Sequence, residues 1–320
     1  MKTLPLGDTG VDVSALCFGA MLFGTRTDEE PSRALLDRYC DAGGTFIDTA
    51  NVYAHWIEGG VGGESEKLLS RWMKDRGNRE SLFLAGKVGF AYPGDELGGA
   101  EKTLKADVIL RECDKSLRRL GVDTIDLYYA HNDDWDTPLA ETLEAFEKLI
   151  QAGKVRFIGA SNNLAWRLAK ALTVSELKGW SRYVAVQNSH TYLRPKLWVD
   201  YRHWPPATDE LMSCCKAERV TPVAYSPLVR GSYTRDDRDF GGRIKFDTPE
   251  NTIRLEALKA MADAKGCTAN QLVLAWMIHS DPPVIPLFSA SKLDQLDENL
   301  GALDVELSAE EMNVLDSAGG

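Results

Sequence analysis

The chain lacks several features that mark whole classes of protein. Its 6 cysteines and 5 histidines include no Cys-x-x-Cys pair and no histidine cluster at ligand spacing, so neither a metal nor a redox dithiol is expected. No apolar run approaches the roughly eighteen residues of a membrane span, and the first residues lack the apolar core of a signal peptide. We therefore expect a cytoplasmic protein.

Positive charge is also scarce. The 37 lysine and arginine residues face 48 acidic ones, which leaves a formal net charge of −11. Nucleic acids and anionic membranes bind basic surfaces, so neither is an expected partner. A phosphate group on a small-molecule ligand would have to be held by a local site, and the oligomeric state stays open.

Linkers and low-complexity tracts are missing as well. A chain of 320 residues with 44% hydrophobic content could form one large domain or two ordinary ones. Because no linker interrupts it, we expect residues 1–320 to form a single domain.

Short runs of β-branched and aromatic residues alternate with amphipathic stretches, which is typical of a parallel sheet with crossover helices. The predicted strands cover residues 15–20, 45–50, 82–88, 124–130, 155–161, 183–189, 221–226 and 284–287. Eight strands at mostly even spacing favour a closed (β/α)8 TIM barrel over an open doubly wound sheet. Residues 3–14, with a turn at 7–10, predict an N-terminal β-hairpin that would plug the barrel floor.

One predicted helix illustrates the intervals between strands. Asp107 can cap its start and Gly121 ends it, and the residues 138–153 repeat the plan. Its polar face would be directed to water and consists of Arg111, Glu112, Lys115, Arg118 and Arg119. Residues 191–209 and 232–251 break the pattern and predict long loops, which are often functional.

Four polar side chains lie at or near the ends of the first predicted strands, where a parallel barrel builds its site. They are Asp48, Tyr53, Lys87 and His131. Each alone has an ordinary explanation: a loop acceptor, a packed ring, a solvated amine, a structural histidine. Together they form a plausible proton-delivery set for a carbonyl oxygen.

The other three residues are each expected to assist proton transfer from the Tyr53 phenol. An adjacent ammonium lowers a phenol pKa of ~10 by roughly 1–3 units, so Lys87 would make Tyr53 a better acid. An unpaired buried ammonium costs about 3–5 kcal/mol, so Asp48 would keep Lys87 charged. His131 would orient the carbonyl oxygen beside the phenol.

Five stretches in order make the chain resemble the aldo-keto reductase superfamily along almost its full length. They are 43–50 with Tyr53, 116–123 leading to His131, 158–162, 224–228 and 298–300. The resemblance implies a (β/α)8 barrel that binds a nicotinamide cofactor without a Rossmann domain. That accounts for the absence of a Gly-x-Gly-x-x-Gly motif after the first strand.

The resemblance also implies roles for individual residues. Tyr53 would be the general acid/base, tuned by Lys87 and Asp48, with His131 positioning the carbonyl. Ser161, Asn162 and Gln187 would bind the carboxamide, and Tyr225 would stack on the nicotinamide. The other implied cofactor contacts are Gly19, Ala20, Met21, Asp48, Ser226, Pro227, Leu228, Gly231, Ser289, Ser291, Lys292, Gln295, Glu298 and Asn299.

Two positions depart from the family pattern, and at the first of them many relatives place glycine where Ser289 stands. Many relatives place an arginine or lysine where Ser291 stands, to bind the 2′-phosphate of NADP. Only Lys292 remains nearby, and one lysine is a weaker phosphate fork than an arginine. NADP(H) is the expected cofactor, and NAD(H) or dual use stays open.

The substrate pocket is expected to have aromatic walls. Its predicted residues are Met21, Phe23, His55, Trp56, Asn132, Asp133, Trp135 and either Trp198 or Trp204. Aromatic walls with carboxylates between them suit a ligand with an apolar face and several hydroxyls, such as a sugar aldehyde or ketose. The predicted activity is interconversion of a carbonyl (aldehyde, ketone or sugar) and an alcohol by hydride transfer.

Two other functions remain open on the sequence. One is a non-catalytic nicotinamide-binding subunit, since the same fold serves as a regulatory β subunit of potassium channels. The other is a Schiff-base aldolase using Lys87, which requires a neutral amine that a paired Asp48 opposes. Borohydride trapping of substrate on Lys87 would support the aldolase.

Overall fold

Eight parallel strands close into a barrel in the computed structural model, which describes residues 1–91, 101–201, 204–235, 237–240, 242 and 244–320. The strand order around the barrel is β10-β11-β12-β3-β4-β5-β8-β9. The strands are β3 (Cys17–Gly19), β4 (Phe46–Asp48), β5 (Phe83–Val88), β8 (Ile125–Ala130), β9 (Val155–Ser161), β10 (Tyr183–Ser189), β11 (Thr221–Tyr225) and β12 (Ile285–Phe288). The predicted (β/α)8 barrel is confirmed, and only β12 extends beyond its predicted range, by one residue.

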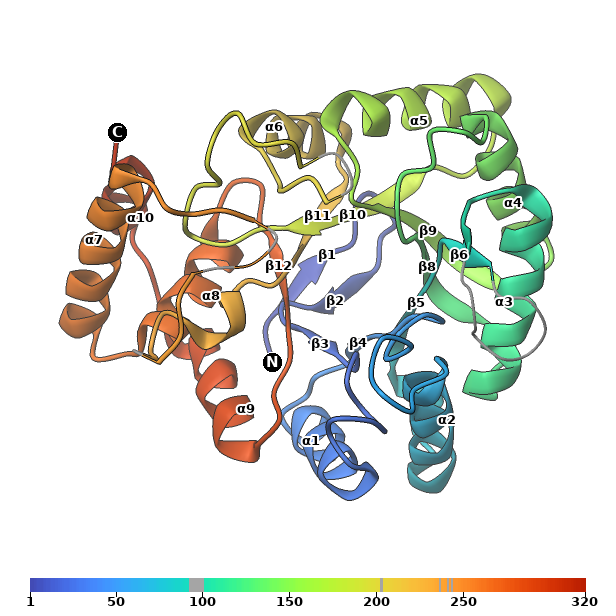
Figure 1. Ribbon diagram of the computed structural model, residues 1–320, viewed down its shortest axis with the longest axis horizontal. Helices are drawn as coiled ribbons and strands as arrows, with labels where there is room; N and C mark the ends of the chain where they lie inside the picture. Colours follow the sequence, from blue (N-terminus) through green and yellow to red (C-terminus); the bar gives the residue numbers. More distant parts are fainter. Residues whose placement is uncertain (92–100, 202–203, 236, 241, 243) are drawn as a thin grey trace.

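Helices surround the barrel, as Figure 1 shows. They are α1 (Glu29–Asp41), α2 (Glu64–Arg76), α3 (Ala106–Leu120), α4 (Leu139–Gln151), α5 (Ala165–Lys178), α6 (Asp209–Glu218), α7 (Pro249–Lys265), α8 (Ala269–His279), α9 (Leu293–Leu300) and α10 (Ala309–Ser317). Short 3-10 turns are η1 (Arg79–Ser81), η2 (Val229–Gly231) and η3 (Gly301–Asp304). Helices α7 and α10 pack together on the outside of α8. None of the helices in the described ranges combines the length and the apolar character needed to cross a membrane.

An N-terminal hairpin precedes the barrel, as predicted. Strands β1 (Thr3–Pro5) and β2 (Asp12–Ser14) pair antiparallel. Leu6 and Val13 are fully buried and join the core cluster inside the barrel. A second pair, β6 (Phe90–Ala91) with β7 (Glu101–Lys102), follows β5 and was not predicted.

Helix α3 corrects two of our expectations. Lys105 is its N-cap residue, whereas Asp107 lies within the first turn, and Gly121 ends the helix with φ +65°. The polar face does not all reach water, because Glu112 and Lys115 are buried. Helices α2 and α4 pack on either side of α3, so these charges must pair with neighbours instead.

The α2–α3 contact contains a buried ion pair, which gives a test of stability. Arg119 of α3 donates from Nε to Glu66 Oε2 at 2.5 Å, and Glu66 is completely buried. Arg119→Met would leave that carboxylate unpaired, at a cost of about 3–5 kcal/mol. We expect the midpoint of thermal unfolding to fall by roughly 5–10 °C. The control Arg118→Met changes an exposed arginine of the same helix, and an equal loss in both variants would contradict the account.

Candidate active site

Alternation along the barrel strands directs the candidate residues toward the barrel axis. Inward-facing members of the internal core include Phe46, Ala85, Tyr129, Ala185 and Val223. Side chains two positions apart in a strand face the same side. The residues two positions further along are Asp48, Lys87, His131, Gln187 and Tyr225. The fold therefore brings these five residues to one end of the barrel.

Lys87 stands at the centre of the group. Its Nζ donates to Asp48 Oδ1, to the carbonyl oxygen of Thr49 at 3.0 Å and to the hydroxyl oxygen of Tyr53 at 2.7 Å. The Tyr53 hydroxyl donates to Asp48 Oδ1 at 3.2 Å. Lys87 and Asp48 have no exposed surface, so their interaction is not screened by water. Acid, amine and phenol thus form one buried hydrogen-bonded unit.

The net pKa of Tyr53 is not lowered in this structure, contrary to the expectation. Burial, followed by the nearby Asp48 carboxylate, raises the pKa of the Tyr53 phenol well above its ordinary value of 10.0. Burial also lowers the pKa of Lys87, against the opposing effect of Asp48. The Tyr53 phenol therefore stays protonated at neutral pH.

His131 lies between two aromatic rings. Its ring makes edge contacts with Tyr53, at a centroid distance of 5.8 Å, and with Phe90, at 5.9 Å. Its Nδ1 is buried and has no hydrogen-bond partner within the described ranges. Burial, together with the charge of Lys87, lowers the pKa of His131 well below 6.5. His131 is therefore a neutral imidazole, and Phe90 is a neighbour that the sequence analysis missed.

These pKa directions predict a flat pH profile. Proton donation needs a protonated Tyr53, and carbonyl orientation by a neutral ring needs an uncharged His131. One pKa lies above 10.0 and the other below 6.5, so neither group titrates between these values. We expect kcat/KM for carbonyl reduction to show no inflection from Tyr53 or His131 between about pH 7 and 9. An inflection near pH 6.5 that disappears in His131→Gln would contradict this assignment.

The predicted carboxamide residues lie together beside this unit. Gln187 Nε2 donates to Asp48 Oδ2 at 3.0 Å, and Ser161 Oγ donates to the Gln187 carbonyl at 2.8 Å. Asn162 Nδ2 donates to the His131 carbonyl at 3.0 Å, while Tyr225 donates its hydroxyl to Asn162 Oδ1 at 2.8 Å. The structure thus connects the predicted cofactor wall to the proton-delivery unit through Asp48 and His131.

The remaining predicted cofactor residues fall on three loops at the strand ends and on helix α9. Gly19 ends β3, and Ala20 and Met21 follow it, with the backbone N–H of Ala20 donating to the carbonyl of Asp48 at 2.9 Å. Ser226 follows β11 in the left-handed region, with φ +56°, and begins the turn through Pro227, Leu228 and Gly231. Ser289, Ser291 and Lys292 are exposed between β12 and α9.

Two predicted cofactor residues of α9, Gln295 and Glu298, already accept hydrogen bonds from other residues of the chain. Gln295 Oε1 accepts from the backbone N–H of Ser291 at 3.0 Å and from its hydroxyl at 3.1 Å. Glu298 Oε1 accepts from the Thr268 hydroxyl at 2.7 Å, and Asn299 is buried. Beside Glu298, the buried Asn270 Oδ1 has no partner in the part of the chain that the structure describes.

These groups fit a nicotinamide cofactor. Amide and hydroxyl groups next to Tyr53 match a carboxamide, and the ring of Tyr225 at a strand end can stack on a planar ring. At the other end of the set of predicted cofactor residues, Asn270 Oδ1, unpartnered among the described residues, supplies a hydrogen-bond acceptor. Lys292, at the N-terminus of α9, supplies a positive charge there.

The predicted substrate-pocket residues differ in their burial and in their contacts. Trp56 is half-exposed and its ring contacts Tyr53 edge-on at 6.4 Å, while His55 contacts Trp56. Phe23 was predicted wrongly as a wall, because it is 1% exposed and packs on Phe18 in the core at 5.6 Å. Met21, Trp135 and Trp198 are exposed, Trp204 is partly buried, and Asn132 is buried.

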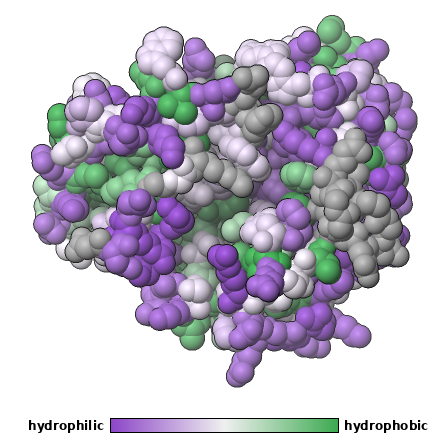
Figure 2. Space-filling view, in the orientation of Figure 1, coloured by the Kyte–Doolittle hydropathy of each residue, from purple (hydrophilic) through white to green (hydrophobic). Residues whose placement is uncertain are grey.

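The prediction of a sugar substrate rested partly on free carboxylates in the pocket. The carboxylate of Asp133 is not free. Arg167 binds both of its oxygens, from Nε at 3.0 and 2.9 Å and from Nη2 at 2.6 Å. Figure 2 shows that the face in view is hollowed near its centre, with pale and green surface in the hollow and hydrophilic side chains around it.

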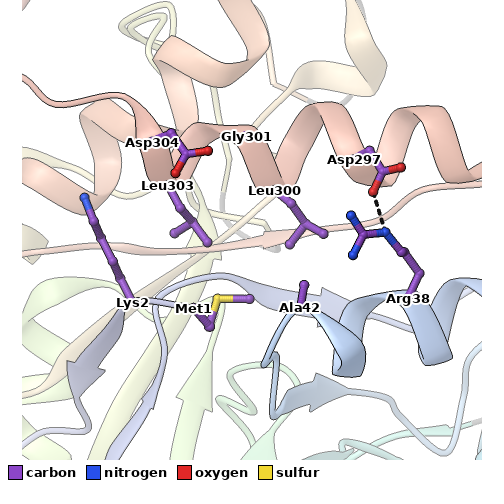
Figure 3. A pocket seen from close by; sticks show the side chains of 9 residues that line it. All are labelled: Met1, Lys2, Arg38, Ala42, Asp297, Leu300, Gly301, Leu303 and Asp304. Atoms are coloured by element: carbon purple, nitrogen blue, oxygen red, sulfur yellow. Dashed lines mark ion pairs between the residues drawn. The ribbon is translucent and has the colours of Figure 1, made fainter.

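A cavity of about 450 Å³ lies away from these residues, between α1 and α9 (Figure 3). Its lining is Met1, Lys2, Arg38, Ala42, Asp297, Leu300, Gly301, Leu303 and Asp304. None of the predicted site residues lines it. The ion pair between Arg38 and Asp297, at 2.8 Å, spans it. No group of three or more side chains suited to a metal ion occurs within the described ranges.

Comparison with known proteins gives a consistent answer. The model of the Aldo/keto reductase family matches residues 15–319. The norsolorinic acid reductase stcV of Emericella nidulans is 34% identical over 322 residues, covering 95% of this chain and 77% of that protein. The aldo-keto reductase yakc [NADP(+)] of Schizosaccharomyces pombe is 31% identical, covering 96% of this chain and 88% of its own.

A solved structure shows the same architecture. It is the crystal structure of a thermostable aldo-keto reductase, Tm1743, in complex with the inhibitor epalrestat. The two chains are 30% identical and superpose with a TM-score of 0.77, over 99% of this chain and 100% of the other.

Proposed function

This chain belongs to the aldo/keto reductase family, and on that premise we propose that it reduces the carbonyl group of a small molecule to an alcohol. Aldehydes, ketones and sugars are the substrate classes considered, NADP(H) is the proposed cofactor, and residues 1–320 act as one domain. One observation carries the proposal: Lys87 contacts both Asp48 and the hydroxyl of Tyr53 in a buried unit. The NADP(+) in the name of the yakc relative supports the cofactor.

The chain's own residues would manage the proton. When bound, a reduced nicotinamide supplies the hydride that adds to the carbonyl carbon. Tyr53 gives its phenolic proton to the carbonyl oxygen, so that hydride and proton together complete the alcohol. Lys87 stabilises the phenolate that remains through its hydrogen bond of 2.7 Å, and Asp48 keeps Lys87 charged. His131 orients the carbonyl oxygen toward Tyr53.

The cofactor would bind to the predicted cofactor residues, beginning with those around Gln187. Ser161, Asn162 and Gln187 would bind the carboxamide, and Tyr225 would stack on the ring, so that one face of the ring is presented to the substrate. To receive the carboxamide, Asn162 would exchange its hydrogen bond from Tyr225. The residues around Ser226 and those from Ser289 to Asn299 would hold the remainder.

The aldolase alternative fits the geometry poorly. A Schiff base needs the lone pair of a neutral amine, and the lowered pKa of Lys87 points in that direction. The amine, however, donates to three oxygens and has no exposed surface. Borohydride with each carbonyl substrate tests this directly, and a covalent adduct on Lys87 would favour the aldolase.

A carbonyl panel tests the proposed activity. Loss of reduced-nicotinamide absorbance is measured with aldoses, ketoses, aliphatic aldehydes and aromatic aldehydes, using NADPH and NADH in parallel. We expect turnover of at least one class. Cofactor binding without turnover of any carbonyl would favour the non-catalytic subunit.

The same assay tests cofactor choice. Lys292 is the cation beside Ser291, and a charge-assisted hydrogen bond to a phosphate is worth about 1.5–3 kcal/mol. We expect kcat/KM to favour NADPH and Lys292→Gln to reduce that preference about tenfold. Lys74→Gln, an exposed lysine on α2, is the matched control. A strong preference of the unmodified protein for NADH would overturn the NADP(H) assignment.

A further inference from the structure

Two tryptophans stand exposed at the ends of neighbouring barrel strands. Trp135 lies in the loop after β8 and is 55% exposed, and Trp166 is the second residue of α5 and is 51% exposed. Their ring centroids are 5.6 Å apart and their planes meet at 85°. Large exposed aromatic surfaces that do not serve the core often mark binding sites.

An ion pair between Arg167 and Asp133 lies against the two rings. The guanidinium carbon of Arg167 lies 5.7 Å from the Trp135 ring centroid and 5.6 Å from that of Trp166. Arg167 is 8% exposed and binds the Asp133 carboxylate through Nε and Nη2. Its Nη2 also donates to the carbonyl of Asp134 at 3.1 Å. Both indoles therefore pack on one fixed cation.

Asp134 fixes the loop that carries Trp135. Its carboxylate accepts from the Leu104 N–H at 2.7 Å, from the Thr137 hydroxyl at 2.7 Å and from the Asp136 N–H at 2.9 Å. A ring on such a loop loses little freedom when a ligand binds, so more of the contact energy appears as affinity. The pair is preorganised rather than loosely exposed.

The two segments that carry the tryptophans each begin at a residue of the candidate active site. Trp135 follows His131 by four residues, and Trp166 follows Asn162 by four. Asn162 in turn donates to the carbonyl of His131 at 3.0 Å. Four residues of chain span at most about 14 Å between Cα atoms, so both tryptophans lie at the same end of the barrel as His131.

We propose that Trp135 and Trp166 form an outer substrate subsite for the planar aromatic end of an elongated carbonyl compound. This inference rests on the proposed function and narrows its substrate class. The perpendicular indoles offer one ring face and one ring edge, which are the two arrangements that planar aromatic groups prefer. Arg167, which lies against both rings, binds the Asp133 carboxylate, so we expect the subsite to take a flat apolar group rather than hydroxyls.

The test compares aldehydes of different reach. Benzaldehyde carries one aromatic ring, biphenyl-4-carbaldehyde extends one ring further, and decanal has length without a plane. We expect Trp135→Ala and Trp166→Ala each to raise KM for biphenyl-4-carbaldehyde by about two- to tenfold. The kcat values, and kcat/KM for benzaldehyde and decanal, should stay within twofold. Leu177→Ala, which removes another exposed apolar side chain of α5, is the control.

A binding measurement separates this inference from the proposed function. Biphenyl-4-methanol is titrated into each variant, and its dissociation constant is read from quenching of tryptophan fluorescence. Weaker binding in both tryptophan variants, with Leu177→Ala unchanged, supports the subsite even if no aldehyde is reduced. Unchanged binding and unchanged KM in both variants would overturn it, as would equal KM increases for benzaldehyde and the biphenyl aldehyde.

Discussion

Tyr53→Phe is expected to lower kcat for carbonyl reduction by about 10²–10⁴-fold, because the variant lacks the proton that the carbonyl oxygen must receive. The phenyl ring keeps the packing of Tyr53 against His131 and Trp56. Cofactor affinity, measured by fluorescence titration, should therefore change less than threefold. The effect is a loss of kcat and not of binding.

The matched control for this substitution is Tyr201→Phe. Tyr201 is a tyrosine of the loop between β10 and α6, and its hydroxyl contacts only the backbone of Lys245 among the interactions described. The control should retain full activity. If Tyr53→Phe kept activity within a few-fold of the unmodified protein, another group would deliver the proton and the proposed mechanism would be wrong.

Lys87→Met should damage both stability and catalysis. The substitution leaves Asp48 as a buried carboxylate without its cation, which costs about 3–5 kcal/mol. It also removes the hydrogen bond that stabilises the phenolate of Tyr53. We expect a lower midpoint of urea unfolding and a fall in kcat of at least about 100-fold.

A double variant separates the two effects. Replacing a whole buried ion pair by neutral groups is often harmless to stability, so Lys87→Met with Asp48→Asn should recover much of the lost unfolding free energy. Activity should not return, because no cation remains beside the phenol. Recovery of both, or of neither, would show that the pair does not act on Tyr53 in the manner described.

The barrel and the placement of the candidate residues follow from local patterns. Short apolar strands at even spacing predicted the closed sheet, and strand alternation carries Asp48, Lys87 and His131 to the same side as the internal core. What the sequence could not supply was the distribution of charge among neighbours. The pKa of Tyr53 depends on burial and on Asp48 accepting from both Lys87 and the phenol, which only distances reveal.

Side-chain environments were harder to predict than strands. Phe23 has the composition of a pocket wall, yet it packs on Phe18 in the core. Phe90 belongs to a two-residue strand, which is too short to show a periodic pattern, although its place just after Lys87 was a usable signal. Glu112 carries a charge that predicts exposure, but the neighbouring helices cover it.

The central claim is that hydride passes from a nicotinamide to a substrate carbonyl while Tyr53 supplies the proton. The most direct measurement uses NADPH carrying deuterium at both hydrogen positions of the reactive carbon of the nicotinamide and follows the label into the product alcohol by mass spectrometry and NMR. The account predicts one deuterium on the carbinol carbon of the product, and formation of this labelled alcohol at least about 100-fold more slowly by Tyr53→Phe. An unlabelled alcohol, or labelled alcohol formed equally fast by Tyr53→Phe, would contradict it.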